Sequence, residues 1–476
     1  MGLGNLAESL VGGIEDAGLN AMGAVFDPVI RLGVTGLSRA GKTVFITSLV
    51  AQLLNRDRMP ALAAAANGAI RAAYLEPQPD DTVPRFDYES NLAALTGPEP
   101  HWPDSTRAIS QLRLSLKVQP TGLLSGLSRQ RTVHVDIVDY PGEWLLDLSL
   151  MDQSFSAWSQ MALDLARTKA RAQSARGWHA ALAASDPDAP FDEIAAQSLA
   201  RAFTAYLKAA RESGFSRCTP GRFLLPGDLE GSPALTFAPL PALSGRAMRG
   251  TLRREMERRY NAYKSKVVKP FFRDHFSRIN RQVVLVDALG AIGRGPEAVE
   301  DLRIAMAEVL SVFRPGRASW LARLTGRRRA DRILFAATKA DHLHHSQHGD
   351  LTAFLDALLR EARDRSDYAG AGTAAMSIAA LRTTVEETRN HGGRRLDCVC
   401  GISALSGKMA AFYPGKLPPD PAKLLVPARN GATSWPENDL ANLRFQPARF
   451  DLKPGEGPPH IRLDRAAEFL LGDRLG

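Results

Sequence analysis

The segment Val29-Ile-Arg-Leu-Gly-Val-Thr35, followed directly by Gly36-Leu-Ser-Arg-Ala-Gly41-Lys42-Thr43, decides the fold of this chain. The apolar residues of the first part predict a buried strand. The spacing of Val44, Phe45 and Leu49 predicts a helix after the second part. Between strand and helix lies the pattern G-x-x-x-x-G-K-[ST], and this order of elements is the context that a phosphate-binding P-loop requires.

The chemistry of this loop favours a bound phosphate chain. Its glycines let the backbone curl, so that successive N–H groups and the positive end of the helix surround the β-phosphate. Lys42 is expected to bridge the β- and γ-phosphates, and Thr43 to offer its hydroxyl to Mg²⁺. The expected nucleotide-binding residues of the loop are Gly36, Ser38, Arg39, Ala40, Gly41, Lys42, Thr43 and Val44.

The rest of the chain reads as an α/β protein. Alternating residues at 110–118 and 131–138 predict a hairpin, and apolar runs at 282–289 and 333–337 predict further strands. Strands that alternate with helices predict a doubly wound, mostly parallel sheet with its ligand at the carboxyl ends of the strands. The expected division is an N-terminal amphipathic helix (1–28), a nucleotide-binding domain in two parts (29–145 and 281–476) and an α-helical insertion (146–280).

A second motif, Asp139-Tyr-Pro-Gly142, closes the predicted hairpin. It places a carboxylate at the carboxyl end of a buried strand beside the P-loop, where P-loop NTPases hold Mg²⁺, so Asp139 is expected to act with Thr43 on the metal. The N–H of Gly142 is expected to reach the γ-phosphate, which lets this segment sense hydrolysis.

A third motif, Thr338-Lys339-Ala340-Asp341, follows the predicted strand at 333–337. An Asp at this place can accept the two hydrogen bonds that guanine offers through N1–H and N2–H₂, and adenine offers no such pair. Lys339 is expected to lie along the base. Ser403 and Ala404, after a predicted strand at 397–400, are expected to donate a backbone N–H to the base carbonyl. Such a site can reject the wrong base by about 10⁴ because an unpaired buried Asp is costly.

Together the segments GLSRAGKT, WPDSTR, DYPGEW, LPGDL, FAATKAD and PHIRLDRA resemble the YcjX-like family of bacterial P-loop GTPases, which is described as stress-associated. The resemblance covers nearly the whole chain. It implies a Ras-like GTPase domain with extra helical structure, GTP or GDP and Mg²⁺ as ligands, and it allows a membrane-anchored partner.

Three residues carry the expected catalysis and the switch. A GTPase needs a loop hydroxyl to complete the Mg²⁺ shell, and Thr106 in WPDSTR is the first choice, with Ser105 second. The neighbouring Arg107 is a candidate arginine finger, although a surface arginine is the commoner reading. Glu143 stands where Ras-like proteins often carry a water-orienting Gln, and it can serve as a general base. Because this departs from the usual pattern, slow intrinsic hydrolysis is expected.

Composition limits the other possibilities. The chain has 476 residues, a formal net charge of +9 and three cysteines, so a disulfide framework is excluded and a reducing cytoplasm is expected. Two arginine-rich segments, at 246–269 and 314–332, read as solvated surface; with no nucleic-acid signature beside them, nucleic acid is not expected as a partner. The first 28 residues allow peripheral membrane contact. His342, His344 and His345 are interpreted as surface residues rather than a metal cluster.

Three functions therefore compete. The first is a GTPase switch in which the γ-phosphate orders the segments around Thr106 and Gly142, with an unidentified protein partner. The second is an ATP-driven enzyme or nucleic-acid motor with Glu143 as its catalytic carboxylate. The third is a scaffold that binds GTP and hardly hydrolyses it.

Overall fold

The computed structural model describes residues 28–36, 40–104, 108–119, 130–242, 245, 247–312, 330–364, 372–431, 435, 440 and 443–476. Several sequence expectations lie outside these residues. They are the N-terminal helix predicted for 1–28, of which residues 1–27 are not described, most of the arginine-rich segment at 314–332, and the roles of Ser38, Arg39, Ser105, Thr106 and Arg107. These expectations stay predictions.

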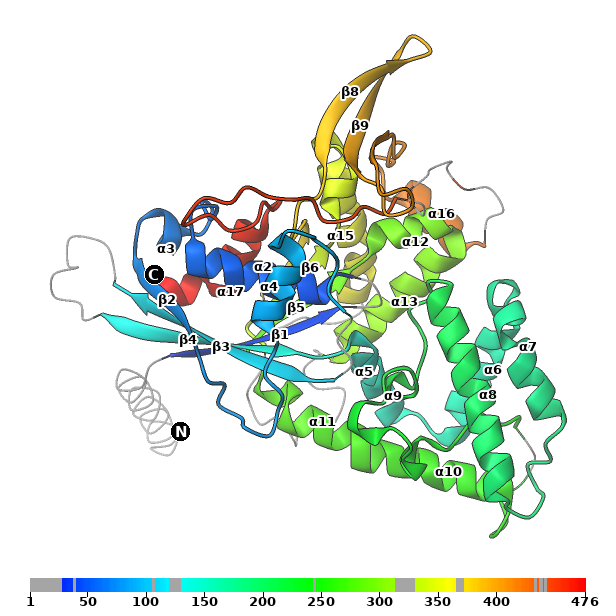
Figure 1. Ribbon diagram of the computed structural model, residues 1–476. Helices are drawn as coiled ribbons and strands as arrows, with labels where there is room; N and C mark the ends of the chain where they lie inside the picture. The colour runs from blue at the N-terminus through cyan, green and yellow to red at the C-terminus, as the bar shows by residue number, and fades with distance from the viewer. Residues whose placement is uncertain are drawn as a thin grey trace, which may run out of the picture.

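A central sheet organises the described part of the chain (Figure 1). Its seven strands stand in the order β2-β3-β4-β1-β5-β6-β7. All neighbouring pairs from β4 to β7 are parallel, whereas β3 runs antiparallel to both β2 and β4. The strands are β1 (Val29–Gly36), β2 (Ile70–Glu76), β3 (Ser110–Val118), β4 (Arg131–Asp139), β5 (Arg281–Val286), β6 (Arg332–Ala337) and β7 (Gly372–Ser377). The predicted doubly wound, mostly parallel sheet is confirmed.

Burial on both faces explains the apolar runs of the central strands. Every residue of β5 is buried. Side chains alternate along a strand, so Val283 and Leu285 enter one core while Val284 and Val286 enter the other. The predicted strand at 282–289 stops at Val286, because the Asp287 side chain accepts a hydrogen bond from the N–H of Gly290 and caps a helix there.

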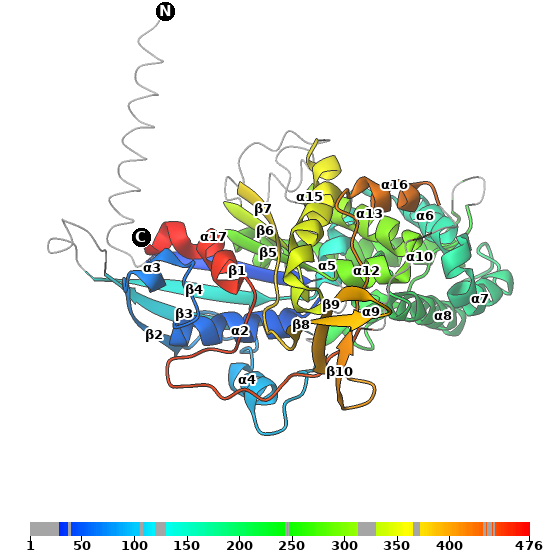
Figure 2. The same ribbon diagram turned by 90° about the horizontal axis from the view of Figure 1, so that it is seen from above.

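Helices cover the two faces of the sheet (Figure 2). On one face α2 (Lys42–Asn55) and α17 (Leu463–Leu475) share a core with β1, β4 and β5. On the other face lie α12 (Ala288–Arg294), α13 (Pro296–Val312) and α15 (His348–Asp364). Shorter helices are α3 (Ala63–Ala66), α4 (Tyr88–Thr96) and α16 (Ala422–Arg429). Nowhere in the described residues is a helix both long and apolar enough to cross a membrane.

A group of helices follows β4 in the chain and precedes β5. It contains α5 (Gly142–Leu146), α6 (Phe155–Arg167), α7 (Lys169–Ala183), α8 (Glu193–Glu212), α9 (Gly221–Leu224), α10 (Leu252–Tyr263) and α11 (Lys269–Asp274). Aromatic packing holds the group together: Trp158 stacks on Tyr260 with ring centroids 4.9 Å apart, and Trp178 on Tyr206 at 5.3 Å. Its buried side chains are continuous with the core over β5 and β6, so it is packed firmly against the sheet.

A second, small sheet stands apart from the first and projects from the molecule in Figure 1. Its antiparallel order is β10-β9-β8, formed by β8 (Val385–His391), β9 (Arg394–Ile402) and β10 (Met409–Phe412). The sequence predicted only one short strand here, at 397–400. The structure assigns that segment to the small sheet and not to the nucleotide-binding sheet.

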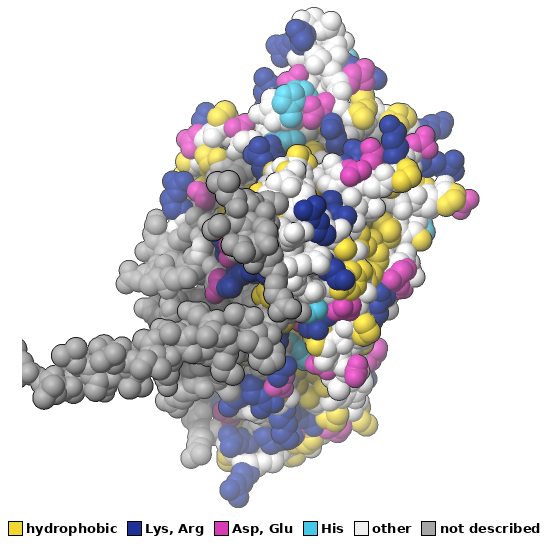
Figure 3. All heavy atoms as spheres, turned by 90° about the vertical axis from the view of Figure 1, so that its left-hand side faces the viewer, with side chains coloured by type: hydrophobic (Ala, Val, Ile, Leu, Met, Phe, Trp, Pro, Cys, Tyr) yellow, Lys and Arg dark blue, Asp and Glu magenta, His cyan; other side chains and the backbone are white. Residues whose placement is uncertain are grey.

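The arginine-rich part of α10 is largely neutralised by ion pairs. Arg254 pairs with Glu257 and Arg258 with Glu255, while Arg259 reaches Glu193 of α8. On the face shown in Figure 3, Lys and Arg side chains are likewise interspersed with Asp and Glu. These pairings agree with the reading of this segment as solvated surface.

Candidate functional site

A pocket of about 430 Å³ lies at the carboxyl edge of the central sheet. The P-loop contributes Gly36, Ala40, Gly41, Lys42, Thr43 and Val44 to its lining. The segments that follow β6 and β7 contribute Thr338, Lys339, Asp341, His342, Ala379, Ala380, Leu381 and Thr383. The pocket thus joins the two motifs that the sequence placed almost 300 residues apart.

The two glycines of the P-loop are needed for different reasons. Gly41 has φ 75° and ψ 34°, in the left-handed region that glycine adopts without strain, and it is the residue from which α2 starts. At Gly36 the limit is space, since an added Cβ would lie 3.1 Å from the Cβ atoms of Ala40 and Leu285. The first turn of α2 carries no acidic residue and no side-chain cap, so its N-terminus is suited to an anion.

Lys42 and Asp139 meet at the P-loop end of the pocket. The Lys42 Nζ atom lies 2.5 Å from Oδ1 of Asp139, whose side chain is 1% exposed. Parallel pairing of β1 and β4 brings the two together, because it sets Val34 opposite Asp139. Buried carboxylate and hydroxyl oxygens are the ligands that Mg²⁺ prefers. Asp139 and the pocket-lining Thr43 therefore fit a magnesium ion better than a soft metal.

Glu143 connects the pocket to the helical group. It lies in the first turn of α5, follows Gly142, and is buried with 5% of its surface exposed. Its Oε1 atom lies 2.9 Å from Nη2 of Arg211, near the end of α8, and both side chains line the pocket. Sequence reasoning missed Arg211, because nothing in α8 marks it and it is 68 residues from Glu143.

The other end of the pocket is built around Asp341. Its Oδ2 atom accepts hydrogen bonds from the N–H of Thr383 at 2.9 Å and from the Thr383 hydroxyl at 2.8 Å. The hydroxyl of Thr384 binds the Asp341 carbonyl. Among the described residues no such donor occupies Oδ1, so one carboxylate oxygen is anchored and the other remains for a ligand.

Lys339 is held in an unusual conformation beside this carboxylate. Its φ of 62° is positive, and its Nζ atom donates to Oδ2 of Asp287 at 2.7 Å. Burial disfavours the charge of Asp287, yet the Lys339 ammonium outweighs this and holds the pKa of Asp287 below its ordinary value. The ion pair fixes the Lys339 stem along the pocket wall.

Ser403 and Ala404 do not have the backbone donors that the sequence argument gave them. The N–H of Ser403 donates to the carbonyl of Lys408, and that of Ala404 to the carbonyl of Arg444. Ala404 does line the pocket. The loop after β7 is the better placed one, because β7 is the parallel neighbour of β6. In the described part of the chain, no backbone acceptor takes the N–H of Ala380.

Aromatic residues complete the wall near Asp341. The His342 ring packs edge-on against Phe445 at 5.0 Å, and the indole of Trp102 donates to the Phe445 carbonyl at 2.8 Å. Burial lowers the pKa of His342. The interpretation of His342 as a surface residue is therefore wrong.

Comparison with known proteins gives consistent results. The sequence model of the YcjX-like family matches residues 30–475. The chain is 37% identical over 462 residues to the protein named Ras-like GTPase YcjX of Escherichia coli (strain K12), covering 94% of this chain and 96% of that one. It is 34% identical over 473 residues to the protein of the same name from Shewanella oneidensis, covering 94% and 95%.

Proposed function

Because the chain belongs to the YcjX-like family, we propose that it binds GTP and GDP with Mg²⁺ in this pocket, hydrolyses GTP slowly and works as a switch. One observation carries the proposal. A P-loop lysine, a buried strand-end aspartate and an anchored aspartate after β6 line or border a single pocket. This combination of residues supports the binding of a nucleoside triphosphate whose base is guanine.

The phosphate end explains how binding would begin. The Lys42 ammonium leaves Asp139 for the β- and γ-phosphates, and N–H groups at the start of α2 surround the β-phosphate. Asp139 and Thr43 would be the protein groups that hold Mg²⁺. Mg²⁺, when bound, neutralises charge on the phosphates. Thr106 is proposed as the additional ligand of the GTP state.

The base end supports guanine over adenine. The free oxygen of Asp341 can accept from N1–H and N2–H₂ of guanine, and the N–H of Ala380 is a donor for its carbonyl. Adenine has an acceptor at N1 and would leave the buried carboxylate unpaired, which is costly. This argues against the ATP-driven motor.

The chemistry is the attack of a water oxygen on the γ-phosphorus, which breaks the bond to the bridging oxygen and releases GDP and phosphate. Glu143 is proposed to take the proton of that water, and Arg211 to shift its positive charge from Glu143 to the γ-phosphate. Arg107 stays a second candidate for that charge. Since Glu143 lacks the hydrogen-bond donor of Gln and starts in an ion pair, slow turnover is expected.

The same contact explains how the nucleotide state would reach a partner. Glu143 belongs to α5, which directly follows β4, and Arg211 belongs to α8, so a change of their pairing would move α8 relative to α5 and the pocket. We propose that this group presents the binding surface for a protein partner. A membrane-anchored partner and a role in the stress response are both compatible with this proposal.

Binding and turnover of labelled nucleotides test the proposal. Purified full-length protein with Mg²⁺ should take up GTP and GDP saturably, bind ATP at least 100-fold more weakly, and release phosphate from GTP slowly. Lys42→Ala should abolish uptake. Equal binding of ATP and GTP would support the motor, and tight GTP binding with no phosphate release would support the scaffold.

A further inference from the structure

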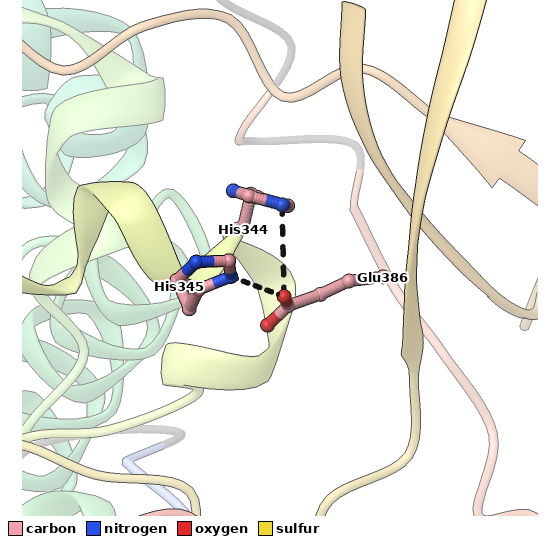
Figure 4. A group of neighbouring side chains, drawn as sticks. All are labelled: His344, His345 and Glu386. Carbon is pink, nitrogen blue, oxygen red and sulfur yellow. Dashed lines mark hydrogen bonds and ion pairs between the residues drawn. The ribbon is translucent and has the colours of Figure 1, made fainter.

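A group of metal-ligating side chains lies outside the nucleotide pocket (Figure 4). His344 and His345 follow residues 338–341, the proposed base-recognition segment. Glu386 belongs to β8 of the small sheet. Each offers one ligand atom, and the three atoms lie within 4.8 Å of one another. Nε2 of His344 is 3.6 Å from Oε2 of Glu386, and Nδ1 of His345 is 2.5 Å from the same oxygen.

The two segments that carry these residues are already fixed relative to each other. Thr383 and Thr384 bind Asp341, so the chain just before Glu386 is tied to the chain just before His344. Two ligands are also partly buried, with side-chain exposures of 14% for His344 and 22% for Glu386. A ligand group held by its surroundings loses little conformational freedom when an ion binds.

The orientation of His344 is set by a second hydrogen bond. Its Nδ1 atom lies 2.8 Å from the hydroxyl of Ser346, which directs Nε2 toward Glu386. Metal-binding histidines commonly use their other ring nitrogen in this way. The backbone N–H of Ser346 also lies 3.4 Å from Nδ1. When Nε2 becomes a ligand, the proton moves to Nδ1, which then donates a hydrogen bond to the Ser346 hydroxyl.

We propose that His344, His345 and Glu386 bind a transition-metal ion of the Zn²⁺ class. Two imidazole nitrogens and one carboxylate oxygen suit zinc, and water completes a tetrahedral shell. Bonds of about 2.0 Å set tetrahedral ligand atoms about 3.3 Å apart. The pair of His344 and Glu386 is close to that spacing. The exposed His345 ring moves outward by about 1 Å to reach it.

The local charges set the expected strength. Both imidazole rings face the Glu386 carboxylate, which favours binding of a cation between them. Opposing this, Nη2 of Arg382 lies 3.8 Å from the other carboxylate oxygen. With one repelling cation and one water ligand, micromolar binding is expected rather than the tighter binding of a closed structural site.

A bound ion would cross-link the base-recognition segment to β8. Leu343 joins His344 to the segment that begins with Lys339, and Thr383 lies three residues before Glu386. The ion therefore adds a further tie, beside the three hydrogen bonds to Asp341. Metal binding should raise the melting temperature of the nucleotide-free protein. This inference does not depend on which nucleotide is bound.

Titration of tag-free, nucleotide-free full chain with Zn²⁺ and Co²⁺ tests the site. About one equivalent should bind, with a Co²⁺ spectrum of nitrogen and oxygen ligands. His344→Ala and Glu386→Gln should each weaken binding at least tenfold. His391→Ala is the matched control, since His391 is an exposed histidine of the same strand, and it should bind as the wild type does.

Three results would overturn the proposal. The first is wild-type protein that binds no stoichiometric metal. The second is unchanged binding in both ligand variants, whose folding is checked by circular dichroism. The third is an intense Co²⁺–thiolate band, because it would assign the metal to Cys398 and Cys400 on β9.

Discussion

Substituting Asn for Asp341 should change the preferred base from guanine to xanthine, and the structure supplies the reason. Thr383 offers two donors, its N–H and its hydroxyl, to one side of residue 341. An Asn amide accepts these two bonds only through its oxygen. The amide NH₂ must then face the pocket, where it repels the N–H groups of guanine and donates to the 2-oxygen of xanthine.

The size of the effect follows from the bonds that change. Guanine loses two hydrogen bonds to a charged acceptor, each worth about 1.5–3 kcal/mol, so the loss of GTP affinity should be at least about 3 kcal/mol. That corresponds to more than 100-fold in Kd. XTP gains a donor to its 2-oxygen in place of a repelling carboxylate, so its affinity should rise and the ratio of the two affinities should change by more than 100-fold.

Equilibrium binding of fluorescent GDP and XDP to both proteins measures this ratio. Asp104→Asn is a suitable control, because Asp104 also lines the pocket and carries the same charge without the two Thr383 bonds. It should leave the ratio near that of the wild type. If Asp341→Asn weakened both nucleotides equally, the assignment of Asp341 to the base would be refuted.

The remaining predictions concern the phosphate end and the helical group. Arg211→Ala should slow single-turnover GTP hydrolysis at least 100-fold with little change in GDP affinity, whereas Arg201→Ala, an exposed arginine of the same helix, should not; equal rates in all three proteins would contradict the role. Lys42→Ala should lower the free energy of unfolding of the nucleotide-free protein by about 3 kcal/mol in urea, since it leaves the buried Asp139 without its cation; an unchanged midpoint would mean that the pair is not formed. Burial raises the pKa of Asp147 from 3.8 to about 7. The folded protein therefore keeps a proton that the unfolded chain has released, and stability present below about pH 4 is lost as the pH rises through 7, by up to roughly 4 kcal/mol. The Asp147→Asn variant should not lose this stability, so its urea midpoint should rise relative to that of the wild type between pH 5 and 8. Parallel pH profiles of the two proteins would contradict the raised pKa of Asp147.

The phosphate half of the site was predictable because its residues are local in sequence. Strand, loop and helix follow one another between Val29 and Asn55, and the positive φ of Gly41 is a property of the loop itself. Asp139 ends the second strand of a predicted hairpin, which pairs with β3 in the register that the alternation implies.

The guanine half was only partly predictable. Asp341 could be identified as a candidate, because its motif follows the apolar run at 333–337. Ser403 and Ala404 were misleading, because a strand followed by Ser-Ala looks the same whichever sheet the strand joins. The strand that does lie beside β6 has the sequence GTAAMS, with small residues and little apolar signal.

By itself, the sequence determined an α/β sheet of the P-loop NTPase type, and it made Lys42, Asp139 and Asp341 the candidates for its chemistry, since each sits in a short motif with its own local geometry. Only the tertiary structure decided that Thr383 anchors Asp341, that Arg211 pairs with Glu143 and that two histidines meet Glu386. These contacts join segments from different elements. Their proximity comes from strand pairing and core packing, which no local pattern encodes.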